Sequence, residues 1–110
     1  MVSKPNRVVS PAALATELRR LDAQLRDTVD QQDWPQLKRC DLEIRRLLQA
    51  QRALLRHPDV VRDLLTLKQT HQAAQSALAS ATELLRQKMN SASEQQERNL
   101  AYQLAMTMEY

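Results

Sequence analysis

Residues 33–57, DWPQLKRCDLEIRRLLQAQRALLRH, combine a helix start signal with a long apolar stripe. Asp33 is a good N-cap because its carboxylate can accept from the free backbone N–H groups of the first turn, and Pro35 sits where its missing N–H costs nothing. Gln36, three residues after the cap, completes a capping-box pattern. The stripe that follows must be buried against other helices, so a central helix is predicted over about 34–56. Its positions, spaced by three and four residues, are Trp34, Leu37, Asp41, Ile44, Leu48, Gln51 and Leu55, widened by Cys40, Leu47 and Leu54.

The flanking segments offer matching stripes. Ser10-Pro11 is an N-cap followed by a proline at the first helical position, which predicts a helix over about 11–31. His57-Pro58 marks the next break and predicts a helix over about 58–89. One face of the first of these helices carries Leu14, Leu18, Leu21, Leu25 and Val29, and one face of the second carries Val61, Leu64, Leu67, His71, Ala74, Leu78, Ala81, Leu85 and Met89.

A fourth helix is expected at the C-terminal end. Ser91 with Glu94, and Ser93 with Gln96, both form capping-box patterns, which predict a break at 90–93 and a short helix over about 93–108. Its stripe is only Leu100, Leu104 and Met108, with Tyr102 to one side. Because so short a helix is marginal unless it docks, we expect its docking to be near balance.

Composition places the chain in the all-α class. The 110 residues include no glycine and only 3% aromatic residues, whereas β-rich folds normally need turn glycines and aromatic or β-branched strands. We therefore predict an antiparallel helical bundle of three longer helices plus a short C-terminal fourth helix, forming a single domain over 10–110 after a flexible arm at 1–9. The residues expected in its core are Leu18, Leu21, Leu25, Ile44, Leu48, Leu64, Leu67 and Leu78.

Charge and cysteine content bear on the surroundings of the protein. The net charge of +3 is small against 16 basic and 13 acidic residues, which alternate in sign as on a solvated face. Cys40 is the single cysteine, so no internal disulfide forms. Residues 1–9 lack the apolar core of a secretory signal, and no run approaches the ~20 apolar residues of a membrane span. We expect a cytoplasmic protein that does not insert in membranes.

The sequence contains no convincing catalytic or metal-binding set. Cys40 and His57 lie at opposite ends of the predicted central helix, ~25 Å apart by helical rise. A pairing of Cys40 with His71 stays conceivable, but a buried thiol and a seam histidine are the simpler interpretation. One cysteine and two histidines are too few for a zinc site, and the absence of glycine excludes a phosphate-cradling loop. We expect no enzyme activity and no cofactor.

Two further features have competing interpretations. Basic residues, among them Arg19, Arg20 and Arg45, could form a nucleic-acid face, but acidic residues are interleaved and aromatic residues are nearly absent, so nucleic-acid binding is not expected. Trp34 is the sole indole, and we interpret it as a plug at one end of the bundle rather than as a binding hot spot.

The layout of these segments resembles the flagellar export chaperones of the FliT family. The likeness covers about residues 12–104 and rests on the Asp33-Trp34-x-x-Leu37 start, the leucine-rich second helix, the Pro break, the Ala-rich third helix and the short fourth helix with Leu100-Ala101-Tyr102. The resemblance implies a type III export chaperone that binds the C-terminal helical segment of the filament-cap protein. It also implies delivery of that segment to the export gate and the export ATPase, and, in enteric relatives, restraint of a flagellar transcription regulator.

The chaperone interpretation assigns roles to two sets of residues. A partner-binding groove is expected between the second and third helices, and the fourth helix is expected to regulate access to it by competing with cargo. The groove residues are Ile44, Leu47, Leu48, Leu67, His71, Ala74 and Leu78, and the regulatory residues are Leu100, Tyr102, Leu104 and Met108. Two alternatives stay open: a structural bundle subunit that forms homo- or hetero-oligomers, including a homodimer, and a small nucleic-acid-binding bundle.

Overall fold

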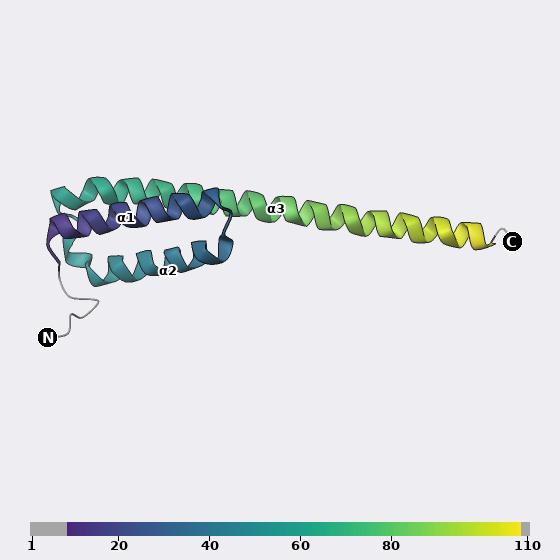
Figure 1. The fold of residues 1–110 in the computed structure, drawn as a ribbon, viewed down its shortest axis with the longest axis horizontal. Helices are drawn as coiled ribbons and strands as arrows, with labels where there is room; N and C mark the ends of the chain where they lie inside the picture. The colour runs from purple at the N-terminus through teal and green to yellow at the C-terminus, as the bar shows by residue number, and fades with distance from the viewer. Residues whose placement is uncertain (1–8, 109–110) are drawn as a thin grey trace. The chain divides into compact units, whose positions relative to one another are not determined.

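The computed structural model describes residues 9–108, and their secondary structure is helical throughout (Figure 1). The elements are α1 (Pro11–Asp30), α2 (Trp34–Ala50), the 3-10 turn η1 (Arg52–Leu54) and α3 (Pro58–Met108). No strand occurs in this range, which confirms the predicted all-α class. Of the arm predicted at 1–9, all but Val9 lies outside the described residues. The chain divides into two compact units, residues 1–77 and 78–110, called unit 1 and unit 2 below.

Both predicted helix starts in the first half of unit 1 are confirmed, and their caps are formed by the expected side chains. The Ser10 hydroxyl accepts from the backbone N–H of Ala13 at 3.1 Å, and Pro11 begins α1. The Asp33 carboxylate accepts from the backbone N–H of Gln36 at 3.2 Å. The side chain of Gln36 completes no reciprocal box; it donates toward Cys40 Sγ at 3.9 Å instead. Each cap satisfies a donor that the first helical turn leaves unpaired.

The link between α1 and α2 is a tight helix-terminating turn. Asp33 N–H donates to the carbonyl of Thr28 at 3.1 Å, and Gln32 N–H donates to that of Val29 at 3.0 Å. These two bonds define a Schellman motif, whose turning residue must adopt a left-handed conformation. Gln32 does so with φ of 54°, although it has a Cβ. Asp33 therefore both closes α1 and caps α2.

The end of α2 differs from the prediction. The helix stops at Ala50 rather than near residue 56, and the chain continues through η1 before α3 begins at Pro58. Proline disfavours the helical conformation in the residue before it, so the chain must leave the α-helix before His57. His57 then serves as the start of α3: its ring Nδ1 accepts from the Asp59 N–H at 3.1 Å, and its carbonyl accepts from Val60 N–H at 2.9 Å.

The core of unit 1 is built from one stripe of each helix. In α1 the stripe repeats at spacings of four and three residues, and in α3 it repeats every seven, which is the periodicity of helices packed side by side. Figure 1 shows α1 and α2 lying alongside each other, and the first part of α3 contacts both, through Asp63 with Arg19 of α1 and through His71 with Asp41 of α2. The buried apolar residues are Leu14, Ala15, Leu18, Leu21 and Leu25 from α1, Leu37, Cys40 and Ile44 from α2, and Val60, Leu67 and Ala74 from α3.

Most of the predicted core is confirmed, with one shift of register. Leu18, Leu21, Leu25, Ile44 and Leu67 are buried as expected. The other three, Leu48, Leu64 and Leu78, are only half-buried. The predicted stripe of the third helix began at Val61, but Val60 is buried and Val61 is 36% exposed. Val60 continues the seven-residue repeat through Leu67 and Ala74, so the face that packs is turned by one residue at its start.

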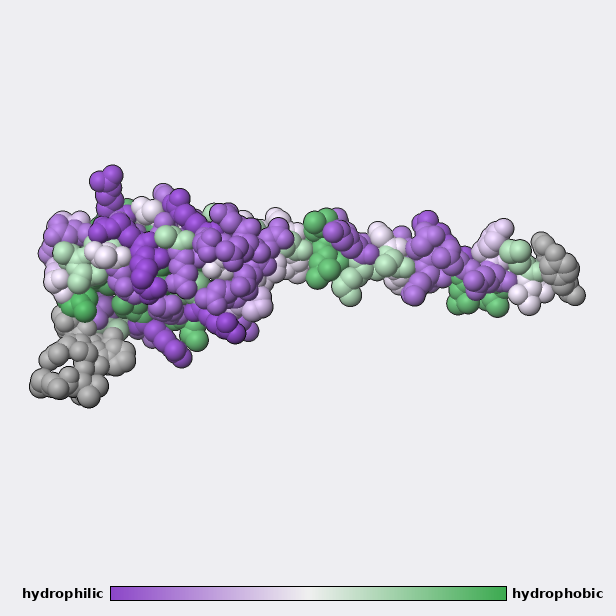
Figure 2. Space-filling model, viewed as in Figure 1, coloured by the Kyte–Doolittle hydropathy of each residue, from purple (hydrophilic) through white to green (hydrophobic). Residues whose placement is uncertain are grey.

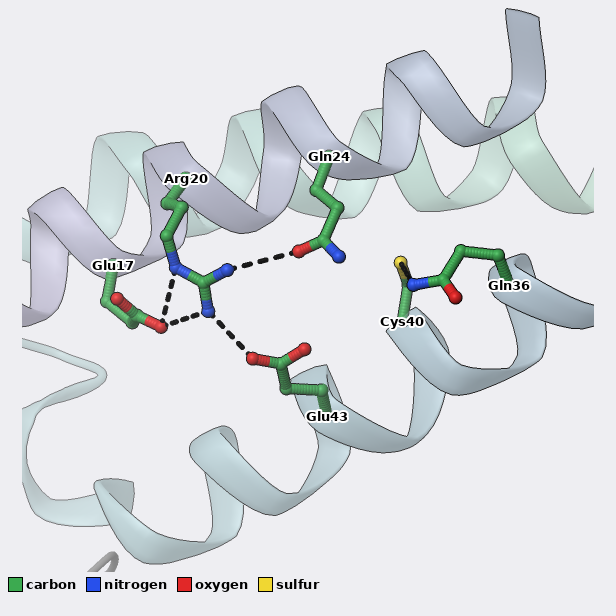
Figure 3. A network of polar contacts seen from close by, with 6 residues as sticks. All are labelled: Glu17, Arg20, Gln24, Gln36, Cys40 and Glu43. Carbon is green, nitrogen blue, oxygen red and sulfur yellow. Dashed lines mark hydrogen bonds and ion pairs between the residues drawn. The ribbon is translucent and has the colours of Figure 1, made fainter. Parts of the chain in front are cut away.

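Charged side chains tie the helices of unit 1 together outside the core. Arg20 of α1 reaches across to Glu43 of α2 at 2.7 Å and also contacts Glu17 and Gln24 on its own helix (Figure 3). The hydrogen bond from Arg20 lowers the pKa of the Glu17 carboxyl, and the two carboxylates together raise the pKa of Arg20 above its ordinary value. Arg19 bonds Asp63 of α3 at 2.9 Å. Ion pairs that are partly exposed to water in this way contribute little to stability, about 0–1 kcal/mol each.

The predicted fourth helix is not a separate element. The expected break at 90–93 is absent, and residues 93–108 are the last part of α3, which runs without interruption from Pro58. A capping-box pattern can also be read through by a helix, because serine is tolerated in helix interiors and no glycine or proline stops the chain there. Side-chain pairs at helical spacing occur on both sides of the predicted break: Glu83 with Arg86 at 2.7 Å and Gln95 with Asn99 at 3.3 Å.

Candidate binding groove

An apolar groove lies in unit 1 between α2, the segment after η1 and α3. It encloses about 400 Å³ and is far more apolar than polar in its lining. Ile44 is buried at its floor together with Leu67, whereas Leu65 is 55% exposed. Leu55, directly after the η1 turn, joins Leu48 of α2 and Leu64 of α3 in the lining. The lining residues are Asp41, Ile44, Arg45, Leu48, Leu55, Leu64, Leu65, Leu67, Lys68 and His71.

A polar cluster closes one side of this groove. The Asp41 carboxylate of α2 bonds Nε2 of His71 on α3 at 2.6 Å, and its other oxygen bonds Nε of Arg45 at 3.0 Å. Asp41 and His71 are 22% and 31% exposed, so the pair sits at the groove edge and not in the core. Arg45 and Lys68 add two positive charges to the rim. The groove therefore offers leucine and isoleucine contacts beside a rim that carries more basic than acidic groups.

The residues predicted for a partner-binding groove are distributed over several places. Ile44, Leu48, Leu67 and His71 all lie in the lining of the observed groove. Leu47 is half-buried outside that lining, Ala74 is 1% exposed within the core, and Leu78 is the first residue of unit 2. The four residues predicted to regulate the groove are all exposed on the last part of α3: Leu100, Tyr102, Leu104 and Met108.

Sequence reasoning left several lining residues out of the groove. Leu55 belonged to the predicted stripe of the central helix, but its place beside the groove depends on the η1 turn, which the stripe does not signal. Leu65 lies next to the stripe position Leu64, and an apolar residue off the stripe is a usable signal for a binding surface. Asp41 and Lys68 lie at the charged rim of the groove. The sequence pattern does not place them there, and the rim position of Asp41 becomes visible only through its contact with His71.

Cys40 is held by polar neighbours in the core of unit 1. Its sulfur lies 3.8 Å from the Thr28 hydroxyl and 3.9 Å from Nε2 of Gln36, and the residue is 1% exposed. The conceivable pairing with His71 has no geometric support, because the described contact of His71 Nε2 is to Asp41. Across residues 9–108, no group of three or more His, Cys, Asp or Glu side chains is placed to hold a metal ion.

The basic residues considered for a nucleic-acid face are partly paired with acidic side chains. Arg19 bonds Asp63, Arg20 bonds Glu17 and Glu43, and Arg45 bonds Asp41. A phosphate backbone would have to compete with these carboxylates. In the part of the chain that the structure describes, no helix has the length and apolar character needed to span a membrane.

Comparison with known proteins identifies no relative of this chain: no family model, no curated protein and no solved structure matches it.

Proposed function

We propose that this protein is a binding protein and not an enzyme, and that it acts as a cytoplasmic type III export chaperone for the flagellar filament-cap protein. The observation that carries the proposal is the apolar groove of unit 1, with its leucine lining and its charged rim. The resemblance of the sequence to the FliT family names the cargo class and adds the export gate and export ATPase as later partners. An antiparallel arrangement of α1, α2 and the first part of α3 would give the groove a rigid base.

The chemistry of the groove fits an amphipathic helix better than an extended strand or a nucleic acid. Helix-in-groove recognition uses apolar anchors spaced three to four residues apart on one face of the partner. A groove of about 400 Å³ has room for a few such anchors and not for a whole helix. Arg45 and Lys68 at the rim favour acidic residues beside those anchors, because complementary charges orient a partner during encounter.

The regulatory part of the chaperone hypothesis changes with the structure. A separate fourth helix at 93–108 no longer serves as the cover of the groove, because those residues continue α3. The proposal retains cargo binding by unit 1 and assigns no cover. It also makes no use of a transcription regulator as a partner, since no residue of the groove points to that role.

The test is a calorimetric titration with a synthetic peptide of the C-terminal segment of the filament-cap protein from the same genome. Leu65→Asp places a charge in the groove at a side chain that is 55% exposed, so it should spare the fold and weaken binding by more than about tenfold. Leu42→Asp is the matched control, since Leu42 is 48% exposed on α2 and does not line the groove.

The outcome separates the open alternatives. Binding to the parent and to Leu42→Asp, with loss in Leu65→Asp, supports the groove as the cargo site. No binding to the parent, or equal binding to all three proteins, contradicts the proposal. If the protein instead bound RNA or DNA, affinity would fall steeply with salt, whereas an apolar helix-in-groove contact changes little.

A further inference from the structure

The outward face of α2 carries basic side chains on both sides of one leucine. At about 100° of rotation per residue, Lys38 and Arg46 lie about 40° from Leu42 around the helix, one on each side. Arg39 and Arg45 lie about 60° from Leu42, again on opposite sides. All five residues are exposed, and Figure 2 shows mostly hydrophilic surface over unit 1. The four basic residues around Leu42 are called the basic strip below.

The two acidic residues of α2 turn away from the basic strip. Asp41 and Glu43 lie about 100° from the centre of the strip, one on each side. Glu43 contacts Arg20 of α1 at 2.7 Å, and Asp41 contacts His71 of α3 at 2.6 Å. Of the strip itself, Arg45 is paired with Asp41, at 3.0 Å. Acidic and basic residues are interleaved along the sequence, which weighed against a nucleic-acid face, but the folded helix sorts the two signs onto different faces.

The other three cations of the basic strip have no acidic partner within residues 9–108. Lys38, Arg39 and Arg46 make no ion pair in this range. Arg39 donates to the side-chain oxygen of Gln36 at 3.3 Å, but that partner is a neutral amide. A basic residue without a carboxylate beside it keeps its full charge for an anion from outside, because no internal partner has to be displaced.

The positive charge continues past the end of α2. Gln49 lies about 20° from the line of Leu42, in the middle of the basic strip. It lines a surface hollow together with Arg52 of η1, so Arg52 extends the strip beyond the helix. Arg52 is exposed and also makes no ion pair with any residue of the described range. From Lys38 to Arg52, four cations without an acidic partner follow one another over about 20 Å of surface.

We propose that the basic strip, extended by Arg52, binds the phosphate backbone of a nucleic-acid duplex without regard to base sequence. A duplex carries one negative charge per about 1.7 Å of its axis, so about 20 Å of it offers more phosphates than the strip has cations. Three of the four unpaired cations are arginines, whose planar guanidinium groups bind phosphate through two parallel hydrogen bonds. The strip contains no aromatic side chain on which an unpaired base could stack, which favours a duplex over a single strand.

An acidic protein and a membrane surface fit the basic strip less well. Protein interfaces are centred on aromatic or apolar anchors, and the only apolar side chain in the strip is that of Leu42, which is 48% exposed. A helix that lies on a membrane buries a continuous apolar face beside its basic residues, which the outward face of α2 lacks. Contacts to backbone phosphates need no apolar surface. This proposal uses the outward face of α2 and does not rest on the chaperone function proposed for the groove.

The test is fluorescence anisotropy of a labelled DNA duplex of about 20 base pairs, titrated with the full chain. With four phosphate contacts, affinity should fall by about 100-fold between 50 and 200 mM salt. Lys38→Gln combined with Arg46→Gln should weaken binding by more than about tenfold at the lower salt and make the slope of log K against log salt shallower by about 2. Arg62→Gln combined with Lys88→Gln is the matched control, since it removes the same charge from exposed positions of α3 and should keep the slope of the parent. Far-UV circular dichroism checks that all variants are folded.

Several outcomes would overturn the proposal. If the parent does not bind the duplex at 50 mM salt, or if the two double variants lose equal affinity, the basic strip is not a phosphate site. Poly-glutamate and vesicles that contain an anionic phospholipid are titrated in parallel. Tighter binding of either than of the duplex would assign the strip to an acidic protein or to a membrane instead. Equal affinity for two duplexes of unrelated sequence supports backbone recognition, and a preference of more than about tenfold for one of them contradicts it.

Discussion

Truncating Leu21 should unfold unit 1 more effectively than any change on the exposed face of the chain. Leu21 lies midway along α1 and is 0% exposed, so Leu21→Ala leaves a cavity in the core of unit 1. Such substitutions cost about 2–5 kcal/mol, a large part of the stability of a small domain. The melting temperature should fall by about 10–30 °C. Leu84→Ala is the matched control, because Leu84 is 53% exposed in unit 2 and its loss should cost less than ~0.5 kcal/mol.

The measurement is urea denaturation followed by two probes. Fluorescence of Trp34, the single tryptophan, reports on unit 1, and far-UV circular dichroism reports on all helices. Leu21→Ala should lower the fluorescence midpoint strongly, and Leu84→Ala should leave it where it is in the parent. Equal midpoints for Leu21→Ala and the parent would refute the position of the core. If the two probes give different midpoints in the parent, the units unfold separately, and the comparison rests on fluorescence alone.

Two smaller effects follow from contacts in unit 1. The lowered pKa of Glu17 means that its ion pair with Arg20 stabilises the fold above the unfolded pKa of a glutamate, about 4.3, and is lost as pH falls through the lower folded value. Urea midpoints of the parent should therefore exceed those of Glu17→Gln at pH 7, and the difference should shrink as the pH falls below about 4.3; a difference that does not change with pH would contradict the role of the pair. Gln32→Gly should raise stability by about 0.5–1 kcal/mol, because glycine adopts the positive φ of that turn without a steric cost, and thermal melting that shows a decrease would contradict it.

The helix starts were predictable because each depends on a few adjacent residues. A serine or aspartate before a proline-containing first turn gives one cap geometry, and both Ser10 and Asp33 form it. The predicted break at 90–93 used the same kind of local signal and was wrong. Ser91 and Ser93 favour a cap only where the chain already leaves the helix, and nothing around them forces it to do so. A cap residue indicates where a helix can begin, but it does not by itself make the preceding helix end.

The groove was predictable only in part, for a related reason. The stripe positions Ile44, Leu48 and Leu67 follow from periodicity, and they lie where two helices meet. Leu55 joins them through a change from α-helix to 3-10 turn, and the contact between Asp41 and His71 spans 30 residues of sequence. The place of Leu55 and the contact between Asp41 and His71 both depend on how the helices pack against one another. The periodicity of a single helix carries no information about that packing.

The length of the helices explains why α3 carries both a core and an open face. A helix covers about as many residues of a neighbour as it contains, and α1 and α2 have 20 and 17 residues, against 51 in α3. The apolar repeat of α3 continues past Ala74 through Leu78 and Met89, so the sequence keeps supplying a packing face after α1 and α2 have no more chain to offer. A protein that needed only the core of unit 1 could end α3 there with polar residues. Instead, leucine and methionine persist to Leu104, and the side chains of Leu85, Met89, Leu100 and Leu104 are exposed on α3.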